Sequence, residues 1–137
     1  MGMWMRVLFV ALGLMLAPVA AWALAPADVV GAWVTETANQ GGEAASGATP
    51  MQISLDSPDA LDGVSPSPGP DATIYGEAVR QADGTLLWSG TWANVWPEGV
   101  TRGTFRFVFA DANSFTGTWS SDDGEIKNAP WNGRRVR

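Results

Sequence analysis

One five-residue pattern occurs three times in the second half of the chain and restricts its fold more than any other feature. Residues 88–92, 115–119 and 131–135 each read aromatic, any residue, glycine, any residue, large residue. Side chains of a β-strand alternate between two faces, so the aromatic residue, the glycine and the large residue of each copy share a face. A glycine weakens the middle of a strand, and we interpret it as a place where a neighbouring ring lies over bare backbone or the strand bends.

Alternation of apolar and polar residues predicts further strands, whereas no segment after residue 23 has convincing helical periodicity. The clearest strand places Phe105, Phe107 and Phe109 on one face. Short turns separate most of the segments. The sequence therefore predicts an all-β fold, either a small antiparallel up-and-down barrel or a strongly curled meander of about seven to eight strands. The expected strands are residues 29–37, 49–55, 72–80, 85–92, 103–110, 115–120 and 130–136.

Two segments interrupt this pattern. Residues 56–71 contain four prolines, which cannot donate hydrogen bonds within a sheet, so we expect a long Pro-rich loop there. Residues 93–102 are expected to form a ten-residue loop that carries Trp96 beside Pro97. An indole in such a loop either marks a recognition site, with Arg102 or Glu98 as a polar neighbour, or plugs one end of the barrel.

The N-terminal segment, residues 1–23, is typical of a signal peptide. Arg6 is its single charge, residues 7–17 are apolar, and Ala21, Trp22 and Ala23 form an A-x-A cleavage pattern. Cleavage after Ala23 leaves residues 24–137 as one domain that is secreted or periplasmic and has no contact with the membrane. The alternative is an uncleaved anchor, because residues 7–27 carry no charge and are long enough to cross a bilayer.

The composition excludes several kinds of chemistry. The chain has no histidine and no cysteine, which rules out Ser-His-Asp triads, thiol nucleophiles, disulfides and ordinary zinc sites. Its 14 acidic and 8 basic residues argue against a nucleic-acid partner. The two acidic clusters do not match the spacing of a calcium loop, so we predict no metal and no cofactor. These clusters are Asp56, Asp59 and Asp62, and Asp122, Asp123 and Glu125.

Carboxylates are the acid–base groups that remain, and Glu36 and Glu77 lie in predicted strands. A carboxyl group on the inner face would have a raised pKa and could transfer protons. Alternation favours an inner position for Ile74, Gly76 and Ala78, which would leave Glu77 outside. We therefore expect no enzymatic activity and assign no catalytic residue. The alternative is a carboxylate-based hydrolase that uses Glu36 and Glu77.

Six tryptophans remain after residue 23, and most of them occupy alternating positions at which they replace a scarce aliphatic core. The alternative is a ligand pocket formed by the same rings, with Trp88, Trp92, Trp96, Arg102 and Trp119 as the candidate binding residues. Two functions follow. The first is a binding module for a small apolar or aromatic ligand or a glycan, and the second is a structural or accessory envelope protein whose filled barrel contacts another protein.

The start of the first strand, Gly31-Ala32-Trp33, resembles the G-x-W signature of calycin-type barrels, the lipocalin and avidin group. This resemblance implies that an arginine near the C-terminus packs across the tryptophan and closes the barrel. Arg135, on the same face as Trp131, matches that arginine, so the resemblance assigns Gly31, Trp33, Trp131 and Arg135 to closure of the barrel. Residues 86–135 also resemble uncharacterised secreted bacterial domains with repeated F-x-G-x-W and W-x-G-x-R hairpins, which implies no activity.

Overall fold

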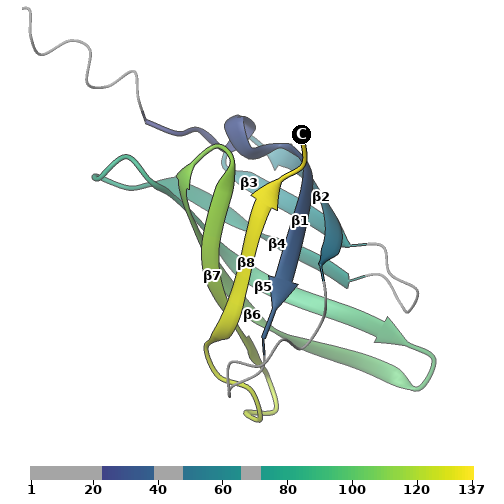
Figure 1. Cartoon of the computed structure of the whole chain (residues 1–137). Helices are drawn as coiled ribbons and strands as arrows, with labels where there is room; N and C mark the ends of the chain where they lie inside the picture. Colours follow the sequence, from purple (N-terminus) through teal and green to yellow (C-terminus); the bar gives the residue numbers. More distant parts are fainter. Residues whose placement is uncertain (1–22, 39–47, 66–71) are drawn as a thin grey trace, which may run out of the picture.

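The computed structural model describes residues 23–38, 48–65 and 72–137, which form a closed eight-stranded antiparallel barrel (Figure 1). Each strand pairs with the next one along the chain, and β8 pairs with β1 to close the barrel. The all-β barrel predicted from the alternation is thus confirmed, whereas the predicted signal peptide falls almost wholly outside the described residues. The strands are β1 (Gly31–Thr37), β2 (Thr49–Ser57), β3 (Ala60–Ser65), β4 (Ala72–Arg80), β5 (Leu86–Trp96), β6 (Gly99–Asp111), β7 (Ser114–Ser121) and β8 (Ala129–Arg135).

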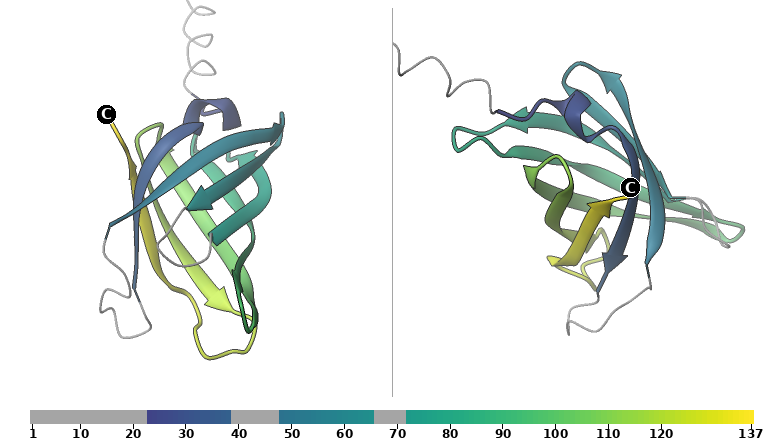
Figure 2. Two further views of the ribbon diagram at one scale, coloured as in Figure 1. Left: turned by 90° about the vertical axis from the view of Figure 1, so that its right-hand side faces the viewer. Right: turned by 45° about the horizontal axis from the view of Figure 1, so that its top comes forward.

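The two ends of the barrel differ. At the capped end, the 3-10 helix η2 (Pro26–Val29) precedes β1, so Val29 belongs to this helix and not to the predicted strand. The open end lies opposite, where β5 and β6 project beyond the other strands (Figures 1 and 2). Among the described residues, no helix is long and apolar enough to span a bilayer.

Aromatic rings fill the barrel from the capped end to its middle. Phe105, Phe107 and Phe109 are buried as their alternation predicts. Phe107 stacks on Phe115 with 4.0 Å between the ring centroids, and Trp88 meets Phe107 edge-on at 5.5 Å. Burying one such side chain contributes about 1.5–3 kcal/mol, so these rings supply the stabilisation that a larger aliphatic core would give.

The repeated glycines make room for neighbouring groups. A Cβ on Gly133 would lie 2.2 Å from Cε2 of Phe115, and one on Gly117 would lie 2.6 Å from Cδ1 of Phe107. The predicted overlap of ring and bare backbone is therefore found at these two positions. At Gly90 the close group is instead the backbone of β4, where the carbonyl oxygen of Tyr75 would be 2.0 Å away.

The prediction of a loop over residues 56–71 is wrong for its first ten residues. β2 continues to Ser57, and β3 pairs with both β2 and β4. Pro58 lies in the turn between them, and the other three prolines follow Ser65, in residues outside the described part. Two of the inward residues of β3, Gly63 and Ser65, are small, which hid the strand alternation. Leu55 follows Met51 and Ile53 in the alternation of β2, but it is 45% exposed at the point where the strand changes register.

The expected loop over residues 93–102 is wrong as well, because β5 and β6 stay paired to the end of their hairpin. Ala93 pairs with Arg102, Val95 with Val100 and Trp96 with Gly99. Only Pro97 and Glu98 separate the strands, with Gly99 at a φ of 153°. We call residues 95–101 the arm, since the pairing of β5 with β4 ends at Asn94 and that of β6 with β7 begins at Gly103.

Candidate binding cavity

The inward side chains become small toward the open end on one side of the barrel and leave a cavity of about 770 Å³. This volume lies within the range of small-molecule sites, about 300–1,000 Å³. The strand alternation continues here unchanged, and only the size of the side chains falls. The small residues are Thr35, Thr37, Thr49, Ser65 and Ala72, which come from β1 to β4.

The opposite wall of the cavity consists of indole rings held by hydrogen bonds. Trp92 meets Trp119 edge-on with 5.6 Å between the ring centroids. Nε1 of Trp92 donates to the carbonyl oxygen of Ser120 at 2.9 Å, and Nε1 of Trp119 donates to that of Ala38 at 3.1 Å. Trp131 completes this wall. Because each of these bonds fixes a ring plane, Trp92 and Trp119 form a preorganised apolar surface.

Two buried side-chain atoms in the cavity wall have no hydrogen-bond partner within the described part of the chain. One is the acceptor Oδ1 of Asn94, and the other is the donor Nε1 of Trp131. A neighbouring hydroxyl is satisfied, since Oγ of Ser65 donates to the carbonyl oxygen of Pro50 at 2.6 Å. An unpaired buried polar atom costs about 1–3 kcal/mol, so a ligand that paired with either atom would recover part of that free energy.

The rim of the cavity is mainly acidic. Among the described residues that line it, Asp122, Asp123 and Glu125 carry carboxylates and Arg102 carries a guanidinium. Asp123 accepts hydrogen bonds from Oγ of Ser121 at 2.6 Å and from the backbone N–H of Glu125 at 2.9 Å. These two bonds lower the pKa of Asp123 below its usual value, so this carboxylate keeps its charge at neutral pH.

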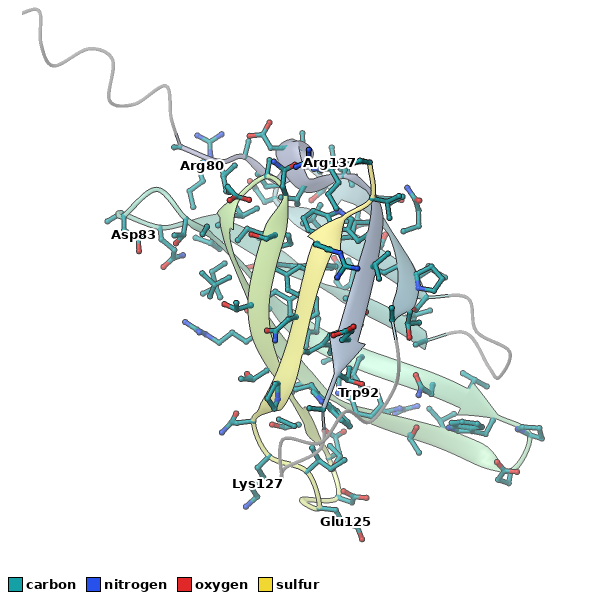
Figure 3. The ribbon with its side chains drawn as sticks, in the orientation of Figure 1. Arg80, Asp83, Trp92, Glu125, Lys127 and Arg137 are labelled. Carbon is teal, nitrogen blue, oxygen red and sulfur yellow. The ribbon has the colours of Figure 1, made fainter. Side chains whose placement is uncertain are left out.

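Figure 3 shows how these groups are placed. Trp92 lies toward the open end, and Glu125 and Lys127 lie in the connection after β7. Arg80, Asp83 and Arg137 lie at the capped end. Glu125 of the rim and Arg137 therefore lie toward opposite ends of the barrel, whereas Lys127 lies in the same connection as Glu125.

Trp96 lies on the arm at the edge of the cavity. Its side chain is 38% exposed, and its Nε1 donates to Oγ1 of Thr101 across the hairpin at 3.1 Å. Neighbouring Val95 and Val100 are more exposed, at 62% and 45%. Trp96 is thus part of a paired strand and leaves the end of the barrel open.

At the capped end, Arg135 lies across Trp33, as the calycin resemblance implies. Its guanidinium carbon is 5.0 Å from the centroid of the indole. The guanidinium donates to the carbonyl oxygens of Ala112 at 3.0 Å, Val30 at 2.9 Å and Asp28. Gly31 has a φ of 138°, and a Cβ there would lie 2.7 Å from Nη1 of Arg135.

The structure divides the predicted binding residues between the cavity and the core. Trp92, Trp96, Arg102 and Trp119 line the cavity. Trp88 does not, because it is fully buried in the core, where its Nε1 donates to the carbonyl oxygen of Gly76 at 3.1 Å.

Trp131, assigned from the sequence to barrel closure with Arg135, lines the cavity at the other end of β8. Glu36 and Glu77 are both exposed, and neither lines this cavity. Sequence reasoning missed Asn94, although the alternation Trp92, Asn94, Trp96 contains its signal.

Comparison with known proteins supports the barrel and names no family. The sequence matches no protein-family model and no curated protein. Among solved structures it is similar to a redesigned beta barrel, b11L5F_LGL, with a TM-score of 0.58 and 16% identity over 84% of this chain and 97% of that one. It is also similar to a redesigned beta barrel, mFAP1, bound to DFHBI, with a TM-score of 0.56 and 19% identity over 81% of this chain and 97% of that one. Likeness at this identity shows the fold alone, a small β-barrel, and it does not place the chain among the calycins.

Proposed function

We propose that this protein is an exported, non-catalytic barrel that binds a small, mainly apolar or aromatic ligand in the cavity at its open end. The observation that carries the proposal is an open cavity whose wall contains indole rings fixed by hydrogen bonds. Trp92 and Trp119 hold their planes through backbone carbonyl oxygens before any ligand arrives. A ligand stacked on them would therefore lose little free energy to ordering of the protein.

The unpaired atoms of the wall suggest what else the ligand carries. Nε1 of Trp131 would pair with an acceptor, and Oδ1 of Asn94 would pair with a donor. A hydroxyl group can fill either role. The barrel mFAP1, which is bound to DFHBI, supports the idea that a fold of this size has room for such a compound.

The exposed positions of Glu36 and Glu77 support a function without catalysis. A pair of carboxyl groups that acts on a bond must share a site, and these two side chains are on the outside of the barrel. The G-x-W start and the predicted signal peptide support the proposal of an exported binding protein, secreted or periplasmic.

A soluble aromatic probe, 4-tert-butylphenol, tests the binding proposal by isothermal titration calorimetry. We expect binding to the unmodified protein and a loss of at least tenfold in affinity in Ala72→Trp, which places a second indole inside the cavity. Val79→Trp is the matched control, because Val79 is 50% exposed on the same strand. The proposal would be contradicted if the unmodified protein and Ala72→Trp had equal affinity for 4-tert-butylphenol. Cellobiose in the same assay tests the glycan as the ligand.

A second candidate, contact with an envelope protein, is favoured by the arm. Val95, Trp96 and Val100 expose apolar surface on a hairpin that projects beyond the barrel (Figure 1). Such a surface is typical of an interaction site. Capture of partners from envelope extracts should then fail for Val95→Glu with Val100→Glu and persist for Val79→Glu. An unchanged set of captured proteins would argue against the arm.

A further inference from the structure

We infer that the ligand of this cavity is an organic cation, a compound in which an alkylated ammonium group is joined to an apolar or aromatic body. This inference rests on the proposed function and names the chemical class of its ligand. Two features of the cavity carry it, the four indoles that line it and the sign of the charge at its rim.

The indoles supply the first feature. Trp92, Trp96, Trp119 and Trp131 come from β5, β7 and β8 and line one space. The face of an aromatic ring is negative, and tryptophan attracts a cation more strongly than phenylalanine or tyrosine does. Several aromatic rings around one space are the arrangement by which proteins recognise quaternary ammonium groups.

The charge at the rim supplies the second feature. Three carboxylates line the cavity, those of Asp122, Asp123 and Glu125, against one positive side chain, that of Arg102. The hydrogen bonds from Ser121 and from the backbone of Glu125 keep Asp123 ionised. The whole chain is acidic as well, with a formal charge of −6. The negative electrostatic potential of these carboxylates raises the local concentration of cations and opposes the entry of anions.

The indoles and the carboxylates act on the same ligand in different ways. Rings at Trp92 and Trp119 would cover the apolar body and the methyl groups of the ammonium, which needs no hydrogen bond. Carboxylates at the rim would attract its charge from a distance. An apolar ligand without charge would use the rings alone, so a neutral compound of the same shape is the appropriate comparison.

The test compares two probes that differ in one atom, (4-hydroxyphenyl)trimethylammonium and its carbon analogue 4-tert-butylphenol, at about pH 6, where both phenols are protonated. We expect the cation to bind the protein at least about fivefold more tightly than the neutral probe. Asp122→Asn should lower the affinity for the cation about twofold or more and leave that for the neutral probe unchanged. Glu36→Gln, which removes a charge from the outer face of β1, is the matched control and should change neither.

Trp96→Leu provides an independent variant that does not endanger the fold, because Trp96 is partly exposed on the arm. Leucine keeps apolar surface and lacks a ring, so the cation should lose more affinity than the neutral probe. Added sodium chloride should reduce the preference for the cation.

The outcomes separate the inference from the proposed function. If 4-tert-butylphenol binds as tightly as the cation or more tightly, and Ala72→Trp still blocks it, the ligand is not an organic cation, and the proposed binding function stands. A preference for the cation that survives both Asp122→Asn and Trp96→Leu would overturn the assignment to this cavity. Binding of neither probe would overturn both proposals.

Discussion

The guanidinium of Arg135 lies 5.0 Å from the centre of the Trp33 indole and joins the last strand of the barrel to the first. The same group donates to carbonyl oxygens of η2, of the residue before β1 and of the β6–β7 turn. Nε1 of Trp33 in turn donates to the carbonyl oxygen of Val29 at 2.9 Å. One arginine thus ties together the segments that cap this end, while the other end stays open.

Arg135→Lys should lower the free energy of unfolding by about 1–3 kcal/mol, because lysine cannot make the planar set of hydrogen bonds or stack on Trp33 in the same way. Urea unfolding followed by tryptophan fluorescence measures the change. Arg134→Lys is the control, since Arg134 is exposed. Equal stabilities of the two variants would show that the closure by Arg135 contributes nothing.

Gly133→Ala should cost about 1–3 kcal/mol, because its Cβ would lie 2.2 Å from the Phe115 ring. Phe115→Leu removes that ring, so the same alanine should cost much less in the Phe115→Leu background. Thr116→Ala, on the exposed face of β7, should change stability little. A glycine-to-alanine cost that is the same in both backgrounds would mean that the ring is not what requires this glycine.

Trp88→Ala and Trp96→Ala should have very different effects on stability. Trp88 is fully buried and bonded to Gly76, so its loss should cost about 3–5 kcal/mol. Trp96 is partly exposed on the arm, and its loss should cost less than about 1 kcal/mol. Chemical denaturation of the two variants gives both values. Similar costs would remove the distinction between core and arm.

Asp123→Asn should reduce the loss of stability in acid. The folded state lowers the pKa of Asp123 through Ser121 and the backbone of Glu125, so the stabilisation is present above the unfolded pKa of about 3.9 and is lost as the pH falls through the lower folded pKa. The variant should be less stable than the protein at neutral pH and equal to it in strong acid. Urea midpoints between about pH 6 and pH 2 test this sign.

Glu98→Gln controls for the loss of one negative charge, since Glu98 lies exposed at the tip of the arm. The assigned hydrogen bonds would be contradicted if the difference in stability between Asp123→Asn and the unmodified protein stayed constant down to strong acid. Asp83→Asn should behave like Asp123→Asn, because Oγ1 and the backbone N–H of Thr85 lower the pKa of Asp83 in the same way.

The sequence was sufficient for the barrel and for most of the rings, because strand alternation is a local property. Phe105, Phe107 and Phe109 reveal their face without any knowledge of their neighbours. The strand at Ala60–Ser65 escaped notice because Gly63 and Ser65 gave its inner face little hydrophobic character. The pairing within the arm escaped notice because all of its residues are exposed, so apolar Val95 and Val100 stand on the face where the alternation would place polar residues.

The cavity depends on which small residues face which rings across the barrel, and this is a property of the closed sheet. Thr35 on β1 and Ser65 on β3 are buried polar residues whose opposite wall is Trp92 and Trp119. The strand order and register that bring them together are not encoded within any one segment. For the same reason, Trp88 and Trp92 look equivalent in the sequence, although one belongs to the core and the other to the cavity.

The central claim is that the tryptophans are divided between a closed core and an open binding wall, and the indole N–H signals of the protein in two-dimensional ¹H–¹⁵N NMR test it most directly. Single Trp→Phe variants assign the signals. On titration with (4-hydroxyphenyl)trimethylammonium, the signals of Trp92, Trp96, Trp119 and Trp131 should shift, and those of Trp33 and Trp88 should stay in place. Shifts of equal size at Trp33 and Trp88, or no shift at the four cavity residues, would contradict the account.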